Sequence, residues 1–99
     1  MLHIVNKSPY EKNALDSCLR VAQPGNAVIL IEDGVYAVAR GGSAAEKLQK
    51  VAGSIKLYAL GPDVEARGMQ ERVIDGVTQV DYAGFVELVT SHTTNQSWL

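Results

Sequence analysis

The run of five apolar residues from Ala27 to Ile31 constrains the fold of this 99-residue chain more than any other feature. A strand with one face in water alternates apolar and polar side chains, whereas a strand buried on both faces is apolar throughout. Strands of the second kind are typical of parallel sheets, in which a crossover connection, usually a helix, joins one strand to the next. The run therefore predicts an α/β fold.

The rest of the chain alternates between strand-like and helix-like segments in the same way. We expect further strands at residues 2–5, 55–60 and 77–80, and helices at residues 9–22, 44–52 and 64–67 and from residue 82 onward. The predicted fold class is α/β, with an open, mainly parallel sheet of roughly four to five strands and helices on both faces. At this length a second independent core does not fit, so we expect a single domain over residues 1–99.

Two of the predicted helices start with a capping signal. Ser8 and Glu11 have the spacing of a capping box, and Pro9 between them suits the first helical position, where its missing N–H costs nothing. Asp81 stands directly before the last predicted helix and is expected to cap it.

Charge and cysteine content exclude several classes of protein. Nine Lys and Arg residues against eleven Asp and Glu give a net charge of -2, so we expect no direct contact with nucleic acid. No apolar run approaches the roughly 20 residues that cross a bilayer, and no membrane contact is expected. Cys18 is the one cysteine and cannot form an internal disulfide. These features predict a soluble protein of the reducing cytoplasm.

Cys18 is also the one candidate thiol nucleophile. A reactive cysteine must be an accessible thiolate, which nearby cations or a helix N-terminus favour. Cys18 instead falls in the middle of a predicted helix, on an apolar stripe with Leu15, Leu19 and Ala22. This position favours a structural role, and a role in catalysis remains the alternative.

Polar residues follow the central strand and the next strand along the chain. Glu32 and Asp33 stand where the central strand ends, at the sheet edge where α/β proteins bind ligands. The alternative is that Asp33 caps the following segment. Asp63 and Arg67 are four residues apart and are expected to form an ion pair. The chain has no glycine-rich phosphate loop, and its histidines lack metal-ligand spacing, so no cofactor and no metal are expected.

A second apolar segment, Val35–Ala39, carries no polar group except the Tyr36 hydroxyl. Trp98 adds a large apolar side chain in an otherwise polar tail. Such groups mark subunit contacts when a small chain cannot cover them, and we predict Val35, Tyr36, Val38 and Trp98 as interface residues. Packing inside the chain itself is the alternative.

Motifs distributed along most of the chain match a known family. They are Leu2-His3, Asn6-Lys7-Ser8-Pro9, Ser17-Cys18-Leu19-Arg20, residues 32–37, 56–63, 66–68 and 81–86, and Trp98-Leu99. In this order they resemble the DsrH/TusB family, the small subunits of bacterial sulfur relay complexes. Among members of this family, the Cys18 segment and the Gly-Pro-Asp turn at residues 61–63 are more similar to DsrH than to TusB.

The resemblance implies a cytoplasmic heterohexamer that contains two copies each of three related chains. In DsrEFH-like complexes, persulfide sulfur passes to or from a DsrC-like carrier during sulfur oxidation, and we expect this function. The alternative is a TusB-like subunit of a TusBCD relay, which works with a TusE-like carrier toward 2-thiolation of the tRNA wobble uridine. The main sulfur-carrying cysteine of such complexes belongs to a DsrE- or TusD-like partner, and the third chain is DsrF- or TusC-like.

The resemblance leaves two further readings of this chain open. Cys18 could carry persulfide, which would make the chain a sulfur-accepting enzyme in its own right. An unrelated α/β binding module is the third hypothesis.

Overall fold

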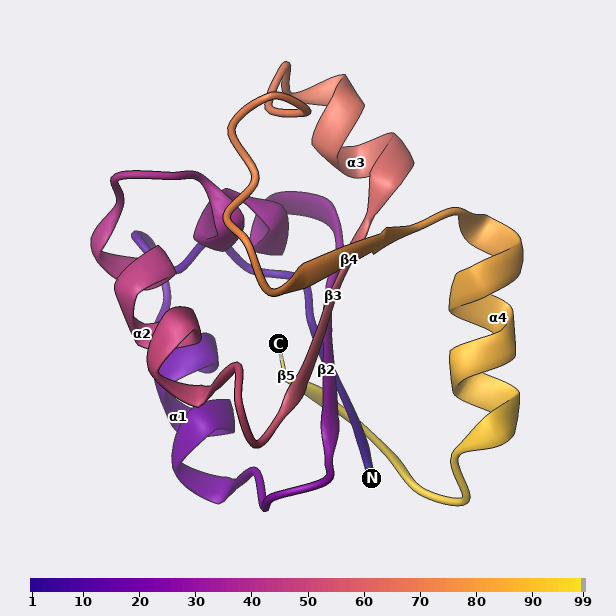
Figure 1. The fold of residues 1–99 in the computed structure, drawn as a ribbon. Helices are drawn as coiled ribbons and strands as arrows, with labels where there is room; N and C mark the ends of the chain where they lie inside the picture. Colours follow the sequence, from indigo (N-terminus) through magenta and orange to yellow (C-terminus); the bar gives the residue numbers. More distant parts are fainter. Residues whose placement is uncertain (99) are drawn as a thin grey trace.

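A computed structural model describes residues 1–98 and shows a five-stranded sheet with helices on both faces (Figure 1). The strands are β1 (Leu2–Val5), β2 (Ala27–Leu30), β3 (Lys56–Leu60), β4 (Val77–Val80) and β5 (Asn95–Trp98). They lie in the order β4-β3-β2-β1-β5, and every neighbouring pair is parallel. The predicted α/β class is confirmed. Leu99, part of the terminal motif, lies outside the described residues.

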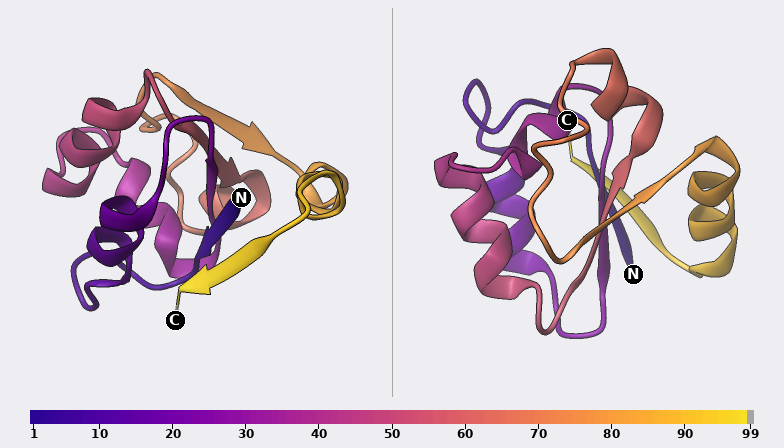
Figure 2. Two further views of the ribbon diagram at one scale, coloured as in Figure 1. Left: turned by 90° about the horizontal axis from the view of Figure 1, so that it is seen from below. Right: turned by 45° about the horizontal axis from the view of Figure 1, so that its top comes forward.

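The strand order decides which face each helix covers. The helical elements are α1 (Ala14–Val21), the 3-10 helix η1 (Glu32–Val38), α2 (Ser43–Val51), α3 (Gly61–Ala66) and α4 (Tyr82–Ser91). From β1 to β4 the chain steps across the sheet in one direction, and it then returns to place β5 beside β1. Because crossovers between parallel strands are right-handed, the return connection lies on the opposite face from the others. Figure 2 shows α4 alone on its side of the sheet, while α1 and α2 lie together on the other.

The two faces of the sheet have cores of unequal size. The larger core lies between the sheet and α1, η1 and α2, and its fully buried members include Val28, Leu30 and Leu48. Beneath α4 the smaller core holds Leu2, Ala27 and Ile29. All four residues of β2 are buried, as its continuous apolar sequence predicts.

The helix predicted to start at Pro9 starts later. Ser8 Oγ accepts a hydrogen bond from the Tyr10 backbone N–H at 3.2 Å, two residues on, which is a local turn rather than a cap. The Ser8 carbonyl accepts from the N–H groups of Glu11 and Lys12, and regular α-helix begins only at Ala14. The predicted capping box is therefore wrong. The Asp81 cap is present, with its carboxylate accepting from the Gly84 N–H at 2.7 Å.

The prediction that Val35 and Val38 form an exposed interface is also wrong. Both side chains are fully buried in the larger core. The segment folds as η1, in which residues three apart share a face, so Val35 and Val38 turn inward together. Tyr36 lies between them in sequence and is 38% exposed.

Strand β5 forms in the segment taken as a polar tail. Its residues pair with β1 in register, Leu2 opposite Asn95 and Val5 opposite Trp98. An edge strand of this kind has little apolar area to bury, so it lacks the apolar signature that identifies β2.

We predict that Val35→Ala lowers the free energy of unfolding by about 2 kcal/mol, because it removes two buried methyl groups and leaves a cavity. Urea denaturation measures the loss. Tyr36→Ala, next in the chain, is the matched control and should cost less than about 1 kcal/mol. Equal losses for the two variants would show that the inward-facing side of η1 has been misassigned.

Candidate functional site

Cys18 lies on the inner face of α1 and its side chain is fully buried in the larger core. Burial penalises the charged thiolate and raises the pKa of the Cys18 thiol from about 9 to about 12. At pH 7 a thiol with that pKa is ionised in roughly one molecule in 10⁵. In this fold Cys18 is therefore neither accessible nor activated.

A polar cluster forms where β2 and β3 end. Glu32 and Asp33 lie at this edge of the sheet, as the sequence predicts, but the contact between them and the Asp63–Arg67 segment was not predicted. Arg67 donates from Nε and Nη2 to Asp33 Oδ1 at 3.1 and 2.8 Å. The hydrogen bond to Asp33, with smaller effects from nearby charges, raises the pKa of the Arg67 guanidinium. The Asp63 carboxylate instead accepts from the Glu32 backbone N–H at 2.6 Å. The predicted pairing of the Asp63 carboxylate with Arg67 is wrong, although Arg67 Nη1 does donate to the Asp63 carbonyl at 3.2 Å.

The backbone at this edge is strained at one residue. Glu32 has a φ of 49°, a left-handed conformation that costs a non-glycine residue roughly 1–2 kcal/mol. Gly34 packs so closely on the end of β1 that a Cβ would overlap the Val5 carbonyl oxygen. Asn6 Nδ2 lies 3.5 Å from Glu32 Oε2, while its buried Oδ1 has no partner among the described residues. Three consecutive strands thus end at one tightly packed polar edge.

His3 and Trp98 are joined in a partly buried hydrogen-bond chain. The Trp98 indole Nε1–H donates to His3 Nδ1 at 3.1 Å, so Nε2 carries the proton when His3 is neutral. That nitrogen lies 3.1 Å from Asn26 Oδ1. Trp98 therefore has a place inside the chain, in β5 against the larger core, and it remains half-buried. Part of the Trp98 side chain thus packs inside the chain, and its predicted contact with another subunit stays a prediction.

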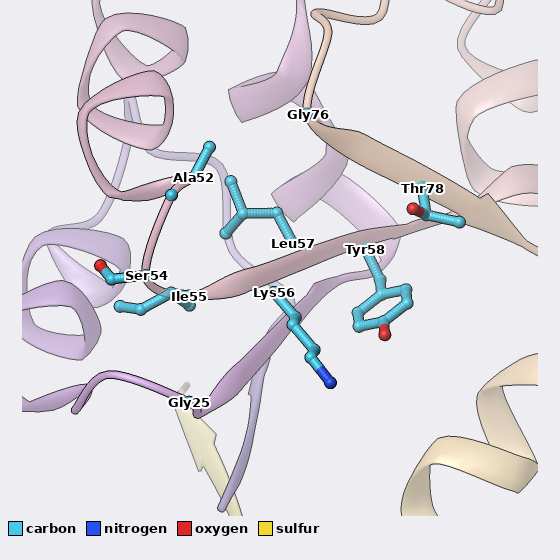
Figure 3. A pocket seen from close by; sticks show the side chains of 10 residues that line it. Gly25, Ala52, Ser54, Ile55, Lys56, Leu57, Tyr58, Gly76 and Thr78 are labelled. Carbon is cyan, nitrogen blue, oxygen red and sulfur yellow. The ribbon is translucent and has the colours of Figure 1, made fainter.

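A hollow of about 330 Å³ lies at the amino end of β3 (Figure 3). Its lining within residues 1–98 consists of turn glycines, aliphatic side chains, hydroxyls and the Lys56 ammonium. In the figure Lys56 and Tyr58 extend from one side of β3 and Leu57 from the other. This is ordinary surface relief between turns. In the described part of the chain, no three His, Cys, Asp or Glu residues gather closely enough to hold a metal ion.

One flank of α4 carries an exposed apolar surface that sequence reasoning missed. Tyr82 and Val86, one turn apart, are each 60% exposed, and no residue of α4 is buried. The inner side chains Phe85, Leu88 and Val89 pack on the smaller core. A signal was available in the sequence, because Tyr82 and Val86 widen the apolar stripe of Phe85, Leu88 and Val89 along one flank of the helix. None of the described helices is both long enough and apolar enough to cross a membrane.

Comparison with known proteins identifies a family. Residues 7–95 match the model of the family described as DsrH like protein. The protein named Protein TusB from Pectobacterium parmentieri is 41% identical over 99% of this chain and the whole of that protein. Protein TusB of an Escherichia coli strain is 34% identical over the same share of each. The predicted family is confirmed, and these relatives carry the name TusB rather than DsrH.

Two solved structures have the same fold. The E. coli ychN protein superposes with a TM-score of 0.81 at 19% identity and covers 97% of each chain. The protein MTH1491 from Methanobacterium thermoautotrophicum gives a TM-score of 0.75 at 18% identity, over 97% of this chain and 95% of its own. At this level of identity the match supports the fold alone.

We predict that folded protein reacts with iodoacetamide at pH 8 at least about a hundredfold more slowly than the chain in denaturant, because Cys18 is buried and protonated. The neutral buried thiol contributes stability below pH 9, and this contribution is lost between about pH 9 and 12, where only the unfolded chain ionises readily. Mass spectrometry measures the labelling. The control Cys18→Ala/Arg20→Cys moves the thiol to an exposed position of the same helix and should react at the rate of an unfolded thiol. Equal rates for the two folded proteins would contradict the burial of Cys18.

Proposed function

Because the chain belongs to the DsrH-like family, we propose that it is a TusB-like subunit of a cytoplasmic sulfur relay that leads to 2-thiolation of the tRNA wobble uridine. The observation that carries the proposal is the 41% identity to a protein named TusB over essentially the full length of both chains. Its role is to support the complex, while a TusD-like sister subunit carries the reacting cysteine. A TusC-like chain and a TusE-like carrier complete the set of partners.

The chemistry of sulfur relay explains this division of labour. In each transfer a thiolate attacks the outer sulfur of a donor persulfide, which forms a new persulfide and releases the donor's own thiolate. No net oxidation occurs, but the attacking group must be ionised and reachable. Burial and the raised pKa deprive Cys18 of both properties. A buried thiol on an apolar helix face instead packs as a small apolar side chain.

The surface of the subunit suits protein partners. The α4 surface, defined by Tyr82 and Val86, is apolar and exposed, and tyrosine is one of the side chains that most often anchor interfaces. Tyr36 and the exposed part of Trp98 are further candidates for contact with sister chains. The net charge of -2 disfavours direct binding of tRNA, which leaves the final transfer of sulfur to other components.

A second candidate is the DsrH role in a DsrEFH-like complex, where a DsrC-like carrier exchanges sulfur during sulfur oxidation. The family description and the Ser17-Cys18-Leu19 segment favour it. The identities to proteins named TusB weigh against it, and the tRNA function is therefore our first proposal. Genes of the sulfite-reductase type beside this one would favour sulfur oxidation instead.

We predict that Cys18→Ala supports sulfur transfer at a rate within about twofold of the wild-type rate when it is assembled with its sister subunits and a carrier. Mass spectrometry of each chain after treatment with a persulfide donor locates the transferred sulfur. The matched control is loss of the corresponding cysteine in the TusD-like chain, which should abolish transfer. A gain of one sulfur on Cys18, absent from Cys18→Ser, would overturn the supporting role and establish this chain as a carrier.

We also predict that Tyr82→Asp/Val86→Asp dissociates the complex and leaves the monomer folded, because both side chains are exposed and the charges desolvate only on assembly. Size-exclusion chromatography measures assembly, and circular dichroism checks the fold. Gln23→Asp/Gln49→Asp adds the same two charges at exposed positions outside α4, so it is the matched control and should assemble normally. An unchanged complex mass for the double variant would remove the α4 surface from the interface.

A further inference from the structure

A cavity of about 370 Å³ lies beside η1 and the start of α2. It shares Arg67 with the polar edge of the sheet, and Cys18 is not part of its lining. Its lining combines two aromatic and three cationic side chains: Tyr10, Tyr36, Arg40, Arg67 and Arg72. The chain has four arginines in total and a net charge of -2, yet three of the four gather here. Such a concentration of guanidinium groups on an acidic protein needs a physical reason.

Backbone pairing forces two of these arginines together. Ala39 and Val73 form an antiparallel bridge between the loop after η1 and the segment that leads to β4. Beside it the Arg40 N–H donates to the Arg72 carbonyl at 2.7 Å, which sets these two residues opposite each other. Like charges placed opposite each other across paired segments are destabilising.

No carboxylate within residues 1–98 forms a salt bridge with either arginine. Arg40 Nη2 donates to the Glu71 backbone carbonyl at 3.3 Å, which leaves its charge uncompensated. The charge of Arg67 is already matched by Asp33, and its guanidinium lies 5.8 Å from the centre of the Tyr36 ring. The cavity is therefore lined by two guanidinium groups without a carboxylate partner, those of Arg40 and Arg72. The third, that of Arg67, is held in place and neutralised by Asp33.

The start of α2 borders the same cavity. Gly41 and Gly42 line it, and Gly42 is the N-cap of α2 with no side-chain hydrogen bond to the first turn. The first N–H groups of a helix have no partner within the helix and favour negative charge. The Tyr10 hydroxyl packs so closely on Gly42 that a Cβ there would overlap it. A glycine at this position therefore lets the Tyr10 ring lie against the start of α2.

We propose that this cavity binds a tetrahedral dianion of the phosphate class, either free phosphate or the phosphomonoester of a nucleotide. The two positive charges of Arg40 and Arg72 are neutralised by a ligand of charge -2. A carboxylate ligand has a single negative charge and would leave one of these arginines without a counter-charge. The guanidinium fork donates paired hydrogen bonds to phosphate oxygens, and the positive end of α2, which begins directly after the lining residue Gly42, favours negative charge nearby. The inference stands on the arginine geometry and does not depend on the sulfur relay.

The test is a titration of the ¹⁵N-labelled full chain, followed by NMR at constant ionic strength. The probes are inorganic phosphate, adenosine 5′-monophosphate and acetate. We expect saturable amide shifts at residues 40–43 and 72 with the two phosphate probes and none of comparable affinity with acetate. Tighter binding of the nucleotide identifies a phosphomonoester as the ligand, and equal or weaker binding identifies free phosphate.

Variants separate a built site from general attraction of anions. Arg40→Gln and Arg72→Gln each remove a charge-assisted contact and should weaken phosphate binding about tenfold or more. Arg72→Lys keeps the charge but loses the fork, and should fall between the wild type and Arg72→Gln. Arg20→Gln, which removes the one arginine outside the cavity, is the matched control and should bind as the wild type does.

Thermal unfolding gives a readout that does not require assigned spectra. Phosphate should raise the melting temperature of the wild type above its value in chloride at equal ionic strength, and should not do so for Arg40→Gln/Arg72→Gln. Both arginines are exposed, so the double variant is expected to fold. Equal binding of acetate and phosphate, or an equal loss of binding in Arg20→Gln, would overturn the proposal.

Discussion

The right-handedness of crossovers between parallel strands is the constraint on which the rest of this structure depends. Three connections advance across the sheet and one returns, so a single helix is left to cover the face opposite α1 and α2. That helix contains no buried residue, and the core beneath it is the smaller of the two. An incompletely covered sheet lowers the stability of an isolated chain of this size, because apolar area stays in contact with water. The same apolar area can be buried against another subunit in an assembly. The topology and the proposed contacts with sister subunits therefore have the same origin.

Sequence reasoning succeeded where a residue's environment is set by its immediate neighbours. The apolar run at Ala27 identified the central strand, and Asp81 identified the start of α4 through a local hydrogen bond. It failed where distant segments decide. Val35 and Val38 were predicted to form an exposed patch, but the 3-10 turn of η1 directs both into the core. Strand β5 forms only because it pairs with β1, which is distant in the sequence. At Ser8 the same hydroxyl can cap a helix or close a turn, and the local spacing cannot separate the two.

The candidate site follows the same division. The positions of Glu32, Asp33 and Asp63 at the edge of the sheet could be predicted, because parallel strands end together. Their partners could not, since Arg67 reaches across 34 positions to Asp33 in preference to the carboxylate four residues before it. Helical periodicity alone was enough to favour a buried Cys18, and the structure places it there. The arginine cavity depends on a bridge between two loops, for which the sequence holds no periodic signal.

Because Trp98 lies in β5 and bonds to His3, its fluorescence can be used to follow the attachment of this strand to the sheet. The chain contains one tryptophan, and its indole is held against a buried imidazole at the far end of the sequence. In the isolated chain its emission therefore reports on the docking of β5 onto β1. Release of the strand exposes the indole to water and shifts the emission to longer wavelength, while the helical signal in circular dichroism persists. Fraying of this sheet edge can thus be followed separately from global unfolding, without any introduced label.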